Sequence, residues 1–117
     1  MQIFYKTSNE NQEFIVHGKL DQESYTQFDH EVKAKYTKGL DVILDLKSLD
    51  YISSVGLRSF ITLAKFVRND KKNIYIKAKE GSMVKKLIYL SGFTKLMPFM
   101  DWLFYDKKTG NKTPSHP

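Results

Sequence analysis

The sequence contains no cysteine and no long apolar run. The absence of cysteine excludes disulfides, thiolate catalysis and thiolate metal sites together, and it is compatible with a reducing compartment. No segment approaches the roughly eighteen consecutive apolar residues that span a bilayer. Residues 1–10 also lack the basic-then-apolar layout of a signal peptide. We therefore expect a cytoplasmic location and no membrane insertion.

Residue patterns that carry catalysis are missing as well. The chain has no glycine-rich phosphate loop, no Cys or His nucleophile paired with a base, and no spaced carboxylate pair. His17 and His30 lack ligand spacing with each other or with a carboxylate. The sequence thus predicts a protein that is not an enzyme and that holds no metal or cofactor.

The composition indicates one ordinary globular domain. A chain of 117 residues that is 41% hydrophobic can bury a single core but is too short for two. The net charge of +6 invites a nucleic-acid partner, but the lysine pairs at 71–72, 85–86 and 107–108 are scattered. No recognition helix or aromatic RNA-binding pattern accompanies them. We expect no direct nucleic-acid binding, and interpret the basic groups as solvated surface or as a surface for an acidic partner or membrane headgroups.

Residues 42–68 form the centre of the sequence. Residues 42–46 are apolar and rich in β-branched side chains, interrupted only by Asp45, which predicts a strand buried on both faces of a parallel sheet. Ser53 and Ser54 follow where a crossover connection enters a helix, and a serine oxygen there can accept a hydrogen bond from the first turn. The helix is predicted from apolar residues at i, i+3, i+4 and i+7 spacing: Leu57, Phe60, Ile61, Ala64 and Val67.

The N-terminal part predicts a hairpin followed by a helix. Residues 2–7 and 12–17 are strand-like and are joined by a polar turn. A helix is expected from Asp21, as its N-cap, to about Lys38. Gly39 is expected to end that helix as a left-handed C-cap.

The C-terminal part predicts a strand, a helix and a closing strand. Residues 74–78 alternate as a strand, Ser82 opens a helix that ends at 91–92, and residues 100–105 form the last strand. The polar residues 107–117 form a tail that adds little to the core. The element order β-β-α-β-α-β-α-β indicates the α/β class. The buried side of the last helix is predicted to consist of Met83, Val84, Leu87, Ile88 and Leu90.

The central segment resembles the STAS domain, the fold of the anti-sigma factor antagonists. The resemblance lies in a buried strand ending in Asp-Leu, a short loop, an aromatic-Ile pair and the run Ser-Ser-Val-Gly-Leu at 53–57. The turn Gly-Lys-Leu-Asp at 18–21 and the run Ser-Gly-Phe-Thr-Lys-Leu at 91–96 are also similar to segments of that family. The resemblance covers roughly residues 2–105. It implies a single STAS domain over 1–106, with a mainly parallel central sheet and an antiparallel N-terminal strand.

The resemblance also implies a function. A STAS antagonist is a partner-switching regulator that binds an anti-sigma factor with serine kinase activity and is released when it is phosphorylated; a PP2C-type phosphatase reverses the reaction. Ser54, two residues before Gly56, matches the phosphoacceptor, with Ser53 as the less favoured alternative. A constitutive STAS subunit of a membrane-lipid transport assembly is the alternative function. The expected surroundings of the phosphoacceptor are Asp21, Asp45, Ser53, Gly56 and Arg58.

Two further expectations concern individual side chains. Asp45 is expected to accept hydrogen bonds from groups around Ser53 and Ser54, with a role confined to its own loop as the alternative. The partner is expected to dock on the exposed part of the central helix. The residues predicted to lie outside the buried stripe of that helix are Ser59, Thr62, Leu63 and Phe66.

Overall fold

A computed structural model describes residues 1–101 of the protein. Five strands and three helices alternate along this part of the chain, as the α/β prediction requires. The elements are β1 (Gln2–Thr7), β2 (Asn11–Leu20), α1 (Tyr25–Lys35), β3 (Asp41–Asp45), β4 (Leu49–Ile52), α2 (Ser54–Asn69), β5 (Ile74–Lys77) and α3 (Met83–Leu90). Among these, no helix is both long and apolar enough to cross a membrane.

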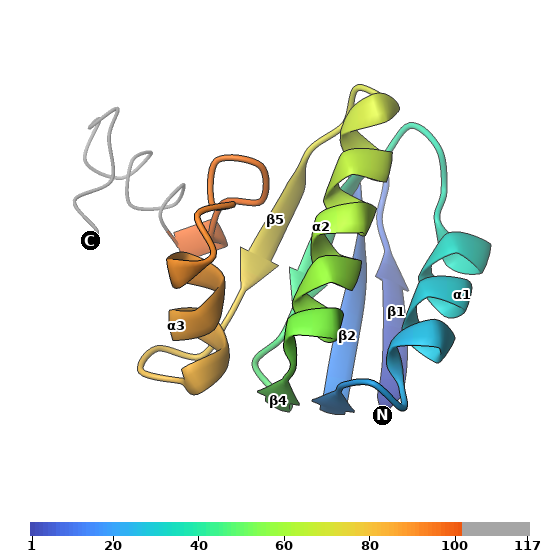
Figure 1. Cartoon of the computed structure of the whole chain (residues 1–117). Helices are drawn as coiled ribbons and strands as arrows, with labels where there is room; N and C mark the ends of the chain where they lie inside the picture. Colours follow the sequence, from blue (N-terminus) through green and yellow to red (C-terminus); the bar gives the residue numbers. More distant parts are fainter. Residues whose placement is uncertain (102–117) are drawn as a thin grey trace.

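The strands form one mixed sheet in the order β1-β2-β3-β5 (Figure 1). β1 pairs with β2 antiparallel, which confirms the predicted hairpin, whereas β2, β3 and β5 run parallel. The long strand β2 also pairs with β4 beyond the end of its pairing with β3. The mainly parallel sheet with an antiparallel N-terminal strand is therefore confirmed.

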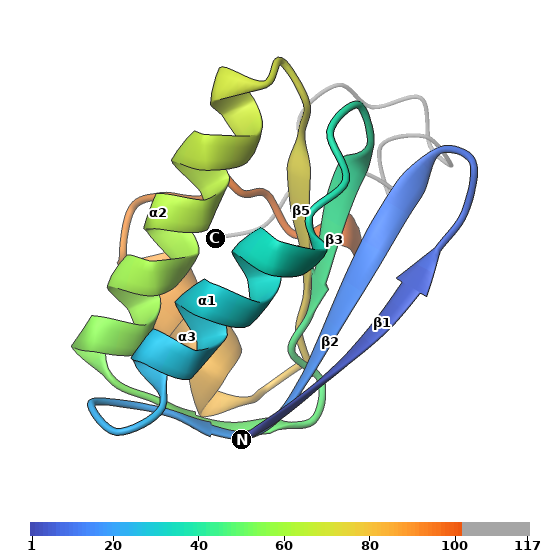
Figure 2. The same ribbon diagram turned by 90° about the vertical axis from the view of Figure 1, so that its right-hand side faces the viewer.

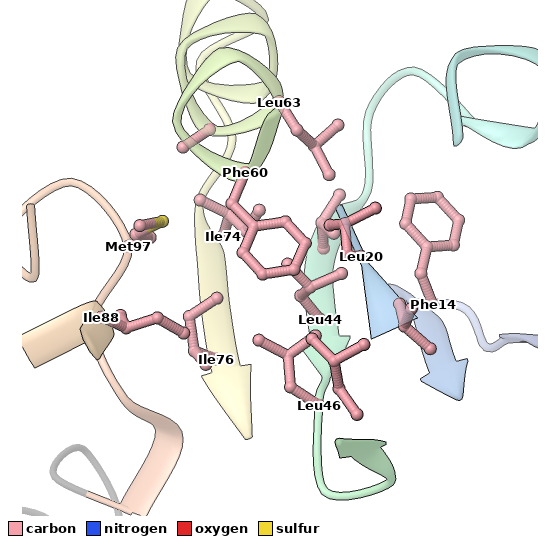
Figure 3. Packing of buried hydrophobic residues seen from close by; sticks show 14 of the residues in the cluster. Phe14, Leu20, Leu44, Leu46, Phe60, Leu63, Ile74, Ile76, Ile88 and Met97 are labelled. Atoms are coloured by element: carbon pink, nitrogen blue, oxygen red, sulfur yellow. The ribbon is translucent and has the colours of Figure 1, made fainter. Parts of the chain in front are cut away.

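All three helices lie on one face of the sheet (Figure 2). The apolar side chains at alternate strand positions point toward these helices and are fully buried, as Phe14 of β2 and Leu44 of β3 are. Phe60 points from α2 toward the sheet, and Ile88 of α3 lies against Ile76 of β5 (Figure 3). The result is a single two-layer core, with α2 at its centre.

The boundaries of α1 differ from the prediction. The N-cap is Ser24 rather than Asp21, because the Asp21 carboxylate accepts the N–H groups of Glu23 at 3.0 Å and Ser24 at 3.2 Å in a turn before the helix. The helix ends at Lys35, and Tyr36 is already extended. Gly39 has a positive φ of 94°, but it lies in the turn that leads to β3. The prediction of Gly39 as the C-cap was therefore wrong.

The stretch between β3 and α2 contains a strand that the sequence did not predict. Residues 49–52 form β4, parallel to the end of β2. Leu49 and Ile52, at its two ends, are buried. Four residues are too few for an alternating pattern to be recognised, because a loop with two apolar residues has the same pattern.

One isolated bridge lies just before the predicted closing strand. Phe99 pairs with Ile76 of β5, and the Ile76 N–H donates to the Pro98 carbonyl at 2.9 Å. Pro98 has no N–H to add to the ladder. Met100 and Asp101 are helical, so the strand expected from Met100 was wrong at its start. The remainder of that strand and the polar tail at 107–117 lie outside the described residues, and the domain limits of 1–106 stay a prediction.

The orientation of α3 also corrects the sequence analysis. Val84 and Ile88 are buried as expected, but Met83 is 63% exposed and Leu90 is 64% exposed. Lys85 is buried in their place, and its ammonium group contacts Glu80 at 2.7 Å and Asp101 at 3.0 Å. Burial works against the charged form, but these hydrogen bonds outweigh it and raise the pKa of Lys85.

Candidate functional site

Ser53 forms the N-cap of α2. Its backbone is extended, with φ −92° and ψ 174°, and its Oγ accepts the N–H of Gly56 at 3.2 Å. Its carbonyl accepts the N–H of Leu57 at 2.9 Å, the first bond of the helical ladder. Ser53 therefore satisfies an otherwise unpaired donor of the first turn, as an N-cap serine does.

Ser54 is the first residue of α2 and is exposed. Its hydroxyl makes no hydrogen bond with any residue in the range 1–101. The two adjacent serines therefore differ in chemistry, because Ser53 uses its oxygen within the helix and Ser54 leaves its oxygen open to a partner. The Ser54 hydroxyl also lies at the positive end of the helix dipole, where an added negative charge is favoured.

Gly56 allows the start of α2 to lie directly against the end of β2. A Cβ atom at this position would lie 2.6 Å from the carbonyl oxygen of Leu20 and 2.9 Å from its side chain. The same carbonyl accepts the N–H of Ser53 at 2.9 Å. The turn at 18–21 is thus fixed beside Ser53 and Ser54 by backbone contact. The role of Leu20 was not predicted, because a glycine in the first turn of a helix signals such a neighbour only indirectly.

The two aspartates expected around Ser54 serve their own turns. Asp21 accepts hydrogen bonds in the turn before α1. Asp45 accepts the N–H of Lys47 at 3.0 Å and lies 3.8 Å from the Lys47 ammonium group. No hydrogen bond joins Asp45 to Ser53 or Ser54 in the described structure, so the expected contact was wrong and the alternative, a role within its own loop, holds. The side chain satisfies the Lys47 backbone donor in the loop that follows β3.

The residues expected to form a docking surface divide into two groups. Thr62 and Phe66 are exposed, Phe66 by 42%. Ser59 and Leu63 are only 4% and 3% exposed, so the prediction that they lie outside the buried stripe was wrong. The reason is that α2 packs against α1 as well as the sheet, which widens its buried arc. Phe66 also contacts the Tyr36 ring at 5.1 Å, about 18 Å along the helix from Ser54.

Arg58 is the charged residue of α2 nearest to Ser54 on the same face. It lies four residues later, is exposed, and makes no ion pair or hydrogen bond with the rest of residues 1–101. Its guanidinium group is therefore available to a negative charge near Ser54. Within the same range, no group of three His, Asp or Glu side chains is placed to hold a metal ion.

Comparison with known proteins identifies the family. The family model of the STAS domain matches residues 5–109. BtrV of Bordetella bronchiseptica, a candidate anti-sigma factor antagonist, is 33% identical over 82 residues, which cover 69% of this chain and 70% of BtrV. This match includes two thirds or more of both chains.

Solved structures share the fold. An anti-sigma factor antagonist from Mycobacterium paratuberculosis superimposes with a TM-score of 0.75 over 92% of each chain, at 16% identity. The anti-sigma factor antagonist SpoIIAA in its unphosphorylated form gives 0.68 over 93% of this chain and 97% of SpoIIAA, at 14% identity. At these identities the similarity concerns the fold alone. Together with the family match and the BtrV relative, it leads to one conclusion: the chain belongs to the STAS domain family, among the anti-sigma factor antagonists.

Proposed function

We propose that this protein is a non-enzymatic partner-switching regulator that binds an anti-sigma factor with serine kinase activity through the surface around Ser54. Phosphorylation of Ser54 releases it, and a PP2C-type phosphatase restores binding. The observation that carries this proposal is the exposed, unbonded hydroxyl of Ser54 beside the capping hydroxyl of Ser53. A kinase can reach Ser54 without breaking a hydrogen bond of the fold.

The geometry favours Ser54 over Ser53 as the phosphoacceptor. Phosphorylation of Ser53 would convert the Oγ that accepts the Gly56 N–H into an ester oxygen and would place the phosphate in a half-buried position. A phosphate on Ser54 adds about −1.5 to −2 charges at a helix N-terminus, where the dipole favours it by roughly 0.3 to 1 kcal/mol. Arg58, one turn further along, can add a charge-assisted hydrogen bond.

The fold is therefore expected to survive phosphorylation, and the switch must act at the interface. A partner surface that fits the neutral hydroxyl would meet a dianion and its bulk. Covering the phosphate with a partner surface that offers it no cation costs several kcal/mol. A micromolar complex has a binding free energy of only about 8 kcal/mol, so this penalty dissociates most of it. The exposed Thr62 and Phe66 extend the proposed docking surface along α2.

Phosphorylation by the cognate kinase tests the proposal. The protein is incubated with the kinase and ATP, and the phosphate is located by mass spectrometry in the wild type and in Ser54→Ala and Ser53→Ala. We expect phosphate on Ser54, none in Ser54→Ala, and continued labelling of Ser54 in Ser53→Ala. Phosphate on Ser53, or undiminished phosphate in Ser54→Ala, would refute the assignment.

A binding measurement tests the switch itself. Ser54→Asp is expected to keep the far-UV spectrum and cooperative melting of the wild type but to lose at least about tenfold in partner affinity, or 1.4 kcal/mol. Ser54→Ala serves as the matched control and should bind as the wild type does. Unchanged affinity of both Ser54→Asp and the phosphorylated protein would favour a constitutive subunit, such as one in a membrane-lipid transport assembly.

A further inference from the structure

A polar cavity lies in the groove between α1 and α2. The rings of Phe28 and Phe60 meet edge to face at 5.3 Å and fix how the two helices pack. The next residue of α1, Asp29, and the residue before Phe60, Ser59, both line a cavity of about 180 Å³ at this contact. The aromatic pair therefore holds the walls of the cavity in place.

Ser59 is an exception among the buried polar side chains. Gln12, Asp45 and Lys85 are the other buried polar residues of the described chain, and each has a hydrogen-bond partner. Ser59 is only 4% exposed, yet its hydroxyl has no partner among residues 1–101. Buried hydroxyl groups are normally satisfied, so this one points to a group that the isolated chain does not supply.

Asp29 is the corresponding exception among the carboxylates. Every other buried or half-buried carboxylate in residues 1–101 accepts a hydrogen bond or forms an ion pair, whereas half-buried Asp29 does neither. The carboxylates with partners are Glu13, Asp21, Glu31, Asp41, Asp45 and Asp70. The two exceptions, Asp29 and Ser59, line the same cavity.

The cavity is continuous with the surface around Ser54. Val55, the residue after Ser54, and Arg58, one turn later, also line it. A protein that covers Ser54 would therefore also cover the mouth of this cavity. Covering Asp29 without a counterion is unfavourable, because the carboxylate loses water and gains nothing in return. Arg58 does not lie within ion-pair distance of Asp29, so the chain itself does not supply the counterion.

We propose that this cavity receives a lysine or arginine side chain of the anti-sigma factor, with Asp29 as its counterion and the Ser59 hydroxyl as an acceptor for one of its N–H groups. The proposal rests on the proposed function, because it assumes that the partner covers Ser54. It assigns to α1 a part in recognition that is separate from the phosphorylation chemistry. Unphosphorylated protein is the form that presents both Ser54 and the open cavity to the partner.

Partner affinity of charge-neutralising variants tests this proposal. Asp29→Asn keeps the shape of the side chain and should lower the affinity of the unphosphorylated protein at least about tenfold, since it removes one partner of a covered charge pair. Glu23→Gln is the matched control, because Glu23 is exposed, lies just before α1 outside the cavity, and changes the net charge by the same amount. We expect less than about a twofold change for Glu23→Gln.

A second variant separates recognition from folding. Ser59→Ala removes a hydroxyl that has no partner in the isolated chain, so its melting temperature should match that of the wild type while its affinity falls by about threefold or more. Wild-type affinity in Asp29→Asn, or equal losses in Asp29→Asn and Glu23→Gln, would overturn the cavity proposal while phosphate on Ser54 still supported the proposed function. If the wild type formed no complex with the kinase, both proposals would fail together.

Discussion

The two ends of α2 are held to the rest of the molecule in different ways. At its start, the Ser53 N–H donates to the Leu20 carbonyl, and Gly56 lies against the same residue. At its end, the carboxylate of Asp70 accepts the Tyr36 hydroxyl at 2.7 Å and the Gly39 N–H at 3.2 Å. The first end is fixed by backbone contact and the second by side-chain hydrogen bonds.

This difference decides which end is free to bind. The hydrogen bond from Tyr36 is the main cause that lowers the pKa of Asp70, with further help from Gly39 and Lys38. The polar groups at this end are therefore engaged within the fold. At the start of the helix, close backbone packing positions Ser54 without using its hydroxyl. A rigid support with free polar groups is what a recognition site requires.

Gly56→Ala is expected to have the largest effect on this arrangement. The added methyl group would meet the Leu20 carbonyl at 2.6 Å, a contact that cannot be relieved by moving a side chain. Although alanine favours helix formation by about 1 kcal/mol over glycine, we expect a net loss of roughly 3 kcal/mol in the free energy of unfolding. Chemical denaturation measures this loss.

Gly81→Ala provides the comparison for this variant. Gly81 has a positive φ of 79°, but a Cβ atom added there would have no other atom within 4 Å, so only backbone strain opposes the substitution. It should cost about 1 to 2 kcal/mol. If Gly56→Ala were no more destabilising than Gly81→Ala, close packing would not fix the start of α2.

Single alanine substitutions of the two serines should have an intermediate effect. Ser53→Ala removes the acceptor of the Gly56 N–H and should lower the free energy of unfolding by about 1 kcal/mol. Ser54→Ala removes no hydrogen bond of the described structure and should change it by less than about 0.5 kcal/mol. Thermal melting of both variants measures the difference. If Ser54→Ala lost more stability than Ser53→Ala, Ser54 rather than Ser53 would be the N-cap of α2.

The central strand and the start of α2 could be predicted from the sequence because their signals are local. The apolar run at 42–46 and the serines at a helix start need no knowledge of distant residues. Which residues of α2 are buried was predicted less well. Ser59 and Leu63 are buried because α1 lies against that side, and the pairing of Phe28 with Phe60 joins residues far apart in the chain.

The remaining errors arise where a side chain hydrogen-bonds to the backbone. Asp21 resembles an N-cap, but a turn that uses its carboxylate delays α1 to Tyr25. Gly39 resembles a C-cap, but Gln12 of β2 binds the backbone N–H of Thr37 at 2.7 Å and its carbonyl at 2.8 Å, which holds that segment extended. In each case a side chain that hydrogen-bonds to the backbone prevailed over the helix signal, within one turn for Asp21 and from a distant strand for Gln12.

Tyr36→Phe is expected to have a smaller effect at neutral pH than Ser53→Ala, and it tests the other end of α2. The variant loses the hydroxyl that donates to Asp70, in a partly exposed setting, and should lose about 0.5 kcal/mol in the free energy of unfolding. Its ring contact with Phe66 at 5.1 Å is retained, so the change isolates the hydrogen bond. This loss should be visible as a small drop in melting temperature.

The pH dependence of Tyr36→Phe tests the environment of the Tyr36 hydroxyl. Burial and then the bond to Asp70 raise the pKa of Tyr36 above its ordinary value of 10.0. The contribution of Tyr36 to stability is therefore complete below pH 10 and is lost as the pH rises above it, because the unfolded chain ionises first. Tyr36→Phe should consequently lose stability less steeply than the wild type between about pH 10 and pH 12. The pKa of Tyr5 is raised to about 12 by burial and by Glu31, so the stability of Tyr36→Phe should still fall somewhat over this pH range. Adding Tyr5→Phe should remove this remaining fall. Equal slopes in Tyr36→Phe and the wild type would mean that neither burial nor the bond to Asp70 raises the pKa of Tyr36, and that the contrast between the two ends of α2 is smaller than the structure indicates.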